Sequence, residues 1–174
     1  GHNIHGELWH VLLLSAALGR LSALSAGPNC RSWTSLLHKY VKGCPTPKRN
    51  RYTPWESIGT SPKQQEYLDQ ESLLFLKPIF LIVICTAIQQ PIAYVLEHPE
   101  DPELDPERKQ DWLNEKEATT AMPSIWATRL MRDFLSFTGG DLQSFDQGPL
   151  GHAVRKGTTI ATSLPISLNG IRGE

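Results

Sequence analysis

The sequence predicts an α/β fold with a mainly parallel sheet and helices on its faces. Helical patterns alternate along the chain with short apolar runs of strand length, which is typical of this class. The chain has 174 residues, of which 40% are hydrophobic and 20% charged, enough for one domain with a core. Its 13 glycines and 13 prolines separate the predicted elements and indicate a loop-rich protein.

The first helix and the first strand are predicted before residue 27. Residues 7–18 are rich in leucine and alanine, and Gly19 can take the positive φ that ends a helix. Residues 20–26 alternate in polarity and run into a Gly-Pro turn at 27–28, which favours a strand.

The second helix is predicted over residues 61–89. Ser61 has the form of an N-cap, Pro62 occupies the first helical position and Gln64 is placed to return the capping-box bond. Pro78 removes a backbone donor inside the pattern, so we expect two helical pieces. The apolar stretch is too short to span a bilayer, and we expect a buried helix and no membrane partner.

The remaining elements are a strand, a helix and two further strands. Residues 92–96 are continuously apolar, as expected of a central parallel strand covered on both faces. A helical pattern begins at Pro123 and ends at Gly139, with its aromatic residues expected in the core. Residues 142–147 and 158–164 have the composition of strands.

Two connections are distinguished by their charge. Residues 30–60 form a basic loop with interleaved aromatic side chains. Residues 98–120 form an acidic connection that we expect to be a solvated surface loop or a short polar helix. The net charge of -1 gives no overall attraction to nucleic acid, so any such binding must come from a local patch. The candidate nucleic-acid contacts are Arg31, Lys48, Arg49 and Arg51 in this loop and Lys156 ahead of the last strand.

Cysteine and histidine spacing predicts neither a disulfide framework nor a metal site. Cys30, Cys44 and Cys85 are too few and too unevenly spaced for a framework, and no Cys-x-x-Cys pair occurs. A reducing, intracellular compartment, the nucleus included, is therefore expected.

Three unusual clusters lie at the ends of predicted strands. Cys30 follows the first strand, Glu97 follows the second, and the basic pair Arg155 and Lys156 precedes the last. Because ligands collect at the carboxyl ends of parallel strands, we expect these clusters to be neighbours in space. A thiol, a carboxyl group and cations together suit nucleophilic attack on an electron-poor ring.

These clusters resemble motifs of the cytosine-5 DNA methyltransferases. The Gly-Pro-Pro-Cys nucleophile loop of that family is similar to residues 27–30, and its Glu-Asn-Val strand end is similar to residues 97–99. The similarity is closer to methyltransferase-like segments of mobile-element polyproteins, which carry Gly-Pro-Pro-Cys-Arg, Leu-Glu-Gln-Pro-x-Asp-Pro and Asp-Gln-Gly-x-x-Gly-His-x-x-x-Lys-x-Thr-Thr in this order. The counterparts here are residues 27–31, 96–102 and 146–159, so the resemblance covers most of the chain.

The resemblance implies a partial Rossmann-like methyltransferase sheet, strands four to seven, with flanking helices and long loops. Residues 1–174 would form a single, incomplete domain whose last two strands make an antiparallel edge. Cys30 would attack carbon 6 of a flipped cytosine, Glu97 would contact ring nitrogen 3, and Arg155 would steady the glutamate or the target nucleotide. S-adenosylmethionine is the implied cofactor, and DNA and the N-terminal half of the same domain are the implied partners.

The sequence also departs from the family pattern. The Phe-x-Gly-x-Gly motif that approaches the cofactor is absent, Asn29 replaces a proline, and His98 and Pro99 replace the Asn-Val pair. The leading hypothesis is therefore a fragment of a methyltransferase whose intact ancestor was active. The alternatives are a noncatalytic nucleic-acid-binding or structural module of a retroelement-type polyprotein, and a degenerate sequence with no selected function.

Overall fold

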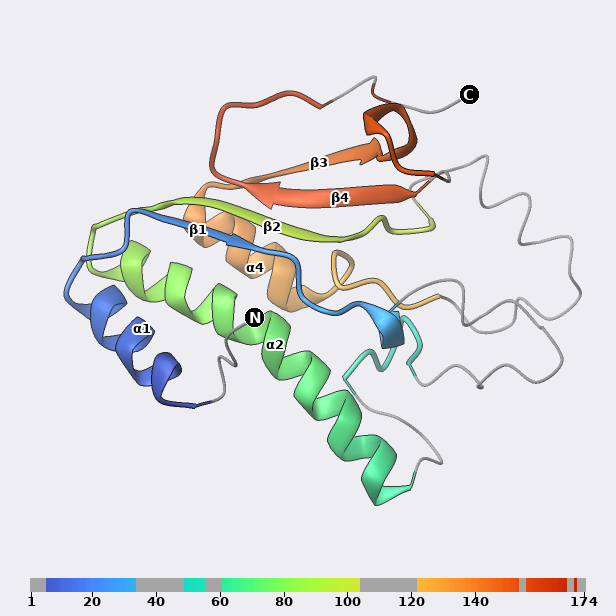
Figure 1. The fold of residues 1–174 in the computed structure, drawn as a ribbon, viewed down its shortest axis with the longest axis horizontal. Helices are drawn as coiled ribbons and strands as arrows, with labels where there is room; N and C mark the ends of the chain where they lie inside the picture. Colours follow the sequence, from blue (N-terminus) through green and yellow to red (C-terminus); the bar gives the residue numbers. More distant parts are fainter. Residues whose placement is uncertain are drawn as a thin grey trace, which may run out of the picture.

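The fold combines helices with one open, four-stranded sheet (Figure 1). The computed structural model describes residues 6–33, 49–55, 61–103, 122–153, 156–168 and 171. In chain order the elements are α1 (Glu7–Ala17), β1 (Ala23–Ala26), the 3-10 turn η1 (Arg31–Trp33), α2 (Pro62–Ala87), β2 (Ala93–Pro99), α4 (Arg129–Thr138), β3 (Asp141–Asp146), the 3-10 turn η3 (Gly148–Leu150) and β4 (Gly157–Thr162).

The strand order is β1-β2-β4-β3, and the sheet is mixed. The β1–β2 pair is parallel, whereas β4 runs antiparallel to both of its neighbours. The predicted α/β class is confirmed, but the prediction of a mainly parallel sheet is wrong. The reason is the short connection from β3 to β4, which contains no crossover helix and so returns the chain in the opposite direction.

The helices pack on one face of the sheet. In β2 the exposure alternates, with Tyr94, Leu96 and His98 buried and the residues between them half-buried. Tyr94 and Leu96 belong to the same core cluster as residues of α1, α2 and α4, and Figure 1 shows these helices along one side of β1 and β2. The prediction that this strand is covered on both faces is therefore wrong, and Glu97 points to the face opposite His98.

Helix α2 begins as the sequence predicts. The Ser61 hydroxyl accepts the Gln64 backbone N–H, and the Gln64 side chain accepts the Ser61 N–H, which completes the capping box. The prediction of two helical pieces is wrong, because α2 is continuous through Pro78. Pro78 is buried with Phe75 and Ile79 on either side of it, and packing over both halves holds the helix together despite the lost hydrogen bond.

By length and composition alone, α2 could cross a membrane, and among the described helices it alone passes that test. Of its most apolar window, 39% is buried inside the structure. Leu81, Ile82 and Cys85 from this window belong to the core cluster, as expected of a core helix.

Helix α4 starts later than predicted. Thr128 is the N-cap, and its hydroxyl accepts the Met131 N–H, so the first helical residue is Arg129 and not Pro123. The predicted end at Gly139 is confirmed, since this residue has a φ of +66° and caps the helix. Of the predicted aromatic core residues, Trp126 and Phe134 are buried, but Phe137 is 52% exposed.

Candidate functional site

Strands β1 and β2 bring Cys30 close to Glu97. The two strands run parallel with Ala26, the last residue of β1, opposite Leu96, so the chain leaves β1 beside Glu97 while β2 continues to Pro99. A Cβ atom on Gly27 would lie 3.1 Å from Glu97 Oε2, which is tighter than ordinary packing allows. The glycine of the Gly-Pro-Asn-Cys motif thus permits the loop that carries Cys30 to pass over the Glu97 carboxylate.

The Cys30 thiol is half-buried, and its surroundings oppose ionisation. Burial raises the pKa of this thiol, the charge of Glu97 raises it further, and the charge of Lys156 lowers it in part. The resting thiol is therefore protonated near neutral pH, and its ionisation is opposed first by burial and then by the charge of Glu97.

Lys156 is the cationic neighbour of Glu97. Its Nζ atom lies 3.4 Å from Glu97 Oε1, and the lysine immediately precedes β4, which pairs with β2. Buried Asp146 fixes this turn, because its Oδ1 atom accepts the Lys156 N–H at 2.8 Å and the Gly148 N–H at 3.0 Å. The sequence analysis missed Asp146, although the Asp-Gln-Gly turn was a signal for it.

Two candidate site residues, Arg155 and Lys48, lie outside the described residues. Arg31 is described and exposed, in agreement with a surface role. The structure therefore brings together Cys30, Glu97 and Lys156 from three distant parts of the sequence.

Arg49 is an interior residue, and its predicted role as a phosphate contact is not supported by its position. It is only 3% exposed, and burial lowers the pKa of its guanidinium to about 10. Its donors bond the Ser32 hydroxyl, the Ser72 hydroxyl and two backbone carbonyls at 2.7 to 3.0 Å. The guanidinium also lies 4.4 Å from the centre of the Trp33 ring, a cation–π contact.

Arg51 faces the other way and joins the segment 49–55 to the end of β2. It donates two hydrogen bonds to the Asp101 carboxylate, at 2.8 and 3.0 Å, and lies 3.3 Å from Glu103. The hydrogen bonds to Asp101 raise the pKa of Arg51. Residues 98–120 were predicted to be solvated, and this is wrong at the start of the segment, because Asp101 is 2% exposed. Residues 104–120 lie outside the described part of the chain.

His98 is buried between aromatic rings. It is 2% exposed and contacts Trp33, Phe75 and Trp126 at ring-centre distances of 5.9, 5.2 and 6.2 Å, all edge-to-face. Burial lowers the pKa of the imidazole to about 3, with contributions from the charges of Arg49 and Lys156. The Nε2 atom is buried and has no hydrogen-bond partner in the part of the chain that the structure describes.

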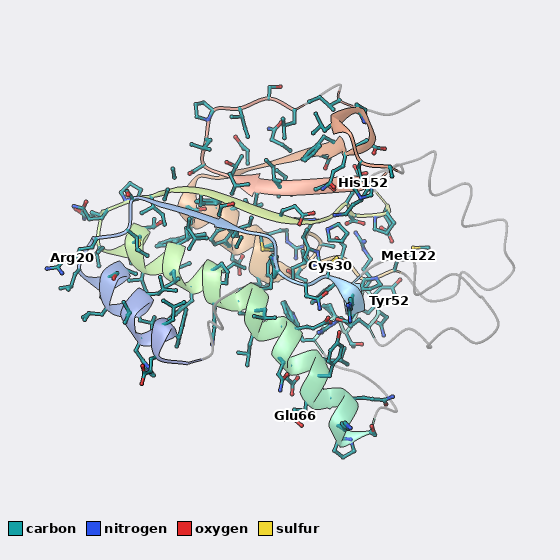
Figure 2. The ribbon with its side chains drawn as sticks, viewed as in Figure 1. Arg20, Cys30, Tyr52, Glu66, Met122 and His152 are labelled. Carbon is teal, nitrogen blue, oxygen red and sulfur yellow. The ribbon has the colours of Figure 1, made fainter. Side chains whose placement is uncertain are left out.

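Tyr52 is presented to solvent at the same end of the sheet. Figure 2 shows Cys30 and Tyr52 both at the end towards which β1 points. Tyr52 is 82% exposed, and the Asn50 Oδ1 atom accepts the N–H groups of Tyr52 and Thr53 at 2.8 and 2.7 Å. Arg49 and Arg51 anchor the backbone ahead of Tyr52, so this aromatic ring is carried by a hydrogen-bonded turn.

No group of three or more histidine, cysteine or acidic side chains in the described ranges could hold a metal ion. Comparison with known proteins finds no matching family model, no matching curated protein and no matching solved structure.

Proposed function

We propose that this chain is a methyltransferase-like fragment in which Cys30 adds to carbon 6 of a cytosine ring and Glu97 protonates ring nitrogen 3. The observation that carries the proposal is the convergence of a thiol, a carboxylate and an ammonium group near the carboxyl ends of two parallel strands, with Glu97 inside the last half of β2. These groups are far apart in the sequence, and the fold alone accounts for their meeting.

The strand arrangement also supports the proposal. The last two strands, β3 and β4, pair antiparallel at one side of the sheet, as the resemblance to cytosine-5 methyltransferases implies. Cys30 follows β1 and Glu97 lies near the carboxyl end of β2, the two strands that run parallel, where ligands collect in open α/β sheets.

The covalent step balances as follows. On base binding the proton of the Cys30 thiol passes to the Glu97 carboxylate, which leaves a thiolate and a carboxyl group. The thiolate gives an electron pair to carbon 6, and the electrons of the bond between carbons 5 and 6 form a new bond between carbons 4 and 5. The electrons of the bond between carbon 4 and nitrogen 3 then take the proton of the Glu97 carboxyl group. Carbon 5 then takes a proton from water. Reversal removes a proton from carbon 5, expels the thiolate and returns the nitrogen proton to Glu97.

The electrostatics of the site couple thiol ionisation to base binding. In the resting site the charge of Glu97 helps to raise the pKa of Cys30. A carboxyl group that shares a proton with the cytosine ring no longer exerts this full negative charge, so the thiolate forms more readily when a base is bound. Lys156, 3.4 Å from Glu97, favours the thiolate in both states.

S-adenosylmethionine, the cofactor that the resemblance implies, does not fit the described residues. Among the described residues, the sheet has no strand that leads through a glycine-rich turn into a helix. Of the described glycines ahead of β1, Gly6 is the N-cap of α1 and Gly19 follows its end. The proposal is therefore confined to the addition of the thiol and its reversal.

A noncatalytic nucleic-acid-binding module is the second candidate. Tyr52 favours it, because its backbone is held by Asn50 while its aromatic ring is exposed, and an exposed aromatic ring is a stacking surface for a base. This module would bind single-stranded nucleic acid without using Cys30.

The proposal is tested by exchange of the hydrogen on carbon 5, which needs no cofactor. Cytosine-containing DNA incubated with the full chain in heavy water should gain deuterium at carbon 5, measured by mass spectrometry. Cys30→Ser should abolish the gain, and Glu97→Gln should slow it by about 100-fold or more. Cys44→Ser serves as the matched thiol control and should exchange at the wild-type rate.

A second measurement uses DNA with 2-pyrimidinone in place of cytosine, a ring more open to addition at carbon 6. A covalent adduct mapped to Cys30 supports the proposal. Absence of both exchange and adduct, together with salt-dependent binding that weakens in Tyr52→Ala, would instead establish the noncatalytic module.

A further inference from the structure

We propose that the aromatic box around His98, formed by Trp33, Phe75 and Trp126, is a positioning device that sets the separation between Cys30 and Glu97. The inference rests on the proposed function for the roles of these two residues, while the geometry of the box is independent of it. Neither Trp33 nor His98 is a catalytic residue in this proposal.

The box joins four separate elements through one imidazole ring. Trp33 comes from η1, Phe75 from α2 and Trp126 from the turn ahead of α4, and each meets His98 of β2 edge-to-face. Phe75 and Trp126 also contact each other, with ring centres 6.2 Å apart. Removing the central ring would take away three of these contacts at once.

On one side the box is linked to the thiol. The Trp33 N–H donates to the Cys30 carbonyl at 2.9 Å, so the ring and the cysteine belong to the same turn. Neighbouring Ser32 is fixed as well, because its N–H donates to Glu71 Oε2 and its hydroxyl accepts from Arg49 Nε. Trp33 therefore cannot shift without moving the backbone that carries Cys30.

On the other side the box is linked to the carboxylate. His98 is the residue after Glu97, and the alternation of β2 places their side chains on opposite faces. Holding the imidazole in the core fixes the strand rotation at this point. Trp126 adds a second restraint, because its indole N–H donates to the Pro99 carbonyl at 2.8 Å.

Ring packing holds the imidazole, and hydrogen bonding through Nε2 does not. This atom is buried without a partner among the described residues, which is a cost that a phenyl ring would not carry. Among the described residues, the charged groups that act on the imidazole are Arg49 and Lys156, both cations, and none of these residues supplies an anion that stabilises a protonated ring. A neutral, flat ring is what the box requires, and phenylalanine should replace it.

The test is the pH profile of Cys30 alkylation by iodoacetamide in the full chain, followed by mass mapping of the Cys30 peptide. Because burial and Glu97 raise the pKa of the thiol, a Cys30 segment released from the box should react at lower pH. We expect His98→Ala and Trp33→Leu to shift the profile downwards by roughly half a pH unit or more.

Two controls separate positioning from a general loss of packing. His98→Phe restores a ring to the box and should keep the wild-type profile. Phe134→Ala removes a buried ring of the same core that packs on Tyr94 at 5.5 Å and does not belong to the box, so it should destabilise the protein without shifting the profile. Circular dichroism identifies any variant that does not fold. If either Trp33→Leu or His98→Ala fails to fold, the other variant still tests the inference.

An unchanged profile in both His98→Ala and Trp33→Leu overturns the inference, as does an equal shift in Phe134→Ala or a failure of His98→Phe to restore the profile. These outcomes are distinguishable from failure of the proposed function. If alkylation shifts as expected but no cytosine exchange occurs, the box positions a thiol and a carboxylate whose chemistry is not addition to cytosine.

Discussion

A buried histidine whose Nε2 atom has no partner in the described part of the chain connects the site to the stability of the protein. His98 is held neutral, with a pKa of about 3 compared with 6.5 for the free side chain. The unfolded chain therefore binds more protons than the folded one between these two values, and the free energy of unfolding rises with pH across that window. The stabilisation is fully present above 6.5 and is lost as the pH falls below it.

We predict that acid destabilises the wild type more than His98→Phe. Each pH unit below 6.5 should cost about 1.4 kcal/mol through this residue, so the difference between the two proteins should change by about 2 kcal/mol between about pH 7.5 and about pH 5. Urea unfolding at both pH values measures it. Parallel curves for the two proteins would show that His98 is not protonated on unfolding.

At the level of single residues, the sequence predicted the meeting of Cys30 and Glu97 from two strands that its composition identifies. The prediction that Glu97 follows its strand is wrong, because β2 continues to Pro99 and Glu97 pairs with Ile160. It did not predict the burial of Arg49. The partners of that guanidinium include the Leu68 carbonyl and the Ser72 hydroxyl, which are distant in sequence and belong to a helix with no marked charge pattern. Basic composition indicates charge, but tertiary packing decides whether the charge is exposed.

At the level of elements, the junction between α4 and β3 depends on two adjacent glycines for different reasons. Gly139 has a φ of +66° but open space around its Cβ position. Gly140 has no such φ, but a Cβ atom there would collide with the Tyr94 ring and lie 3.2 Å from the Thr162 carbonyl oxygen. Gly139 is needed for its left-handed backbone conformation, and Gly140 is needed because a side chain would not fit beside Tyr94.

We predict that Gly140→Ala is more damaging than Gly139→Ala. The left-handed conformation should cost Gly139→Ala about 1 kcal/mol. The collision at Gly140 should cost about 3 kcal/mol or more, because Tyr94 must move and lose its hydrogen bond to Thr138. Chemical unfolding of both variants gives the comparison.

A double variant checks the cause. If the Tyr94 ring is the obstacle, Gly140→Ala combined with Tyr94→Leu should cost less than the sum of the two single changes. Strict additivity would place the damage elsewhere.

Helix ends with a local capping motif were predictable, whereas the start of α4 at Arg129 was not. Ser61, Gln64 and Gly139 act through local backbone bonds that a sequence motif specifies completely. The continuity of α2 through Pro78 was not predictable, because it depends on packing against distant segments.

On the scale of the whole molecule, the described helices and strands all pack against one hydrophobic core. The cluster contains buried residues from α1, α2, α4, β2 and β4, with partly buried residues of β1 and β3 packed against it. Such sharing leaves no boundary at which one part of the described chain could unfold without exposing another.

We predict a single cooperative unfolding transition. Trp9, Trp33, Trp55 and Trp126 all pack in or against the shared cluster. Tryptophan fluorescence and far-ultraviolet circular dichroism should therefore give the same denaturant midpoint. Midpoints that differ beyond error would divide the chain into two units and contradict the single-domain prediction.

The α/β class was predictable from alternating patterns, but the strand order was not. Periodicity identifies strands without saying which neighbours they choose, and the pairing of β4 between β2 and β3 joins positions such as Val95 and Thr162 that are distant in sequence.

The position of β4 between β2 and β3 affects the order in which the sheet can form during synthesis. During synthesis β1, β2 and β3 leave the ribosome before the strand that links β2 to β3 exists. Until Gly157–Thr162 emerges, β2 has an uncovered hydrogen-bonding edge, and β3 has no strand partner in the sheet. The nascent protein is thus most open to pairing with other chains just before its last strand arrives, and a chaperone that delays release would protect it then.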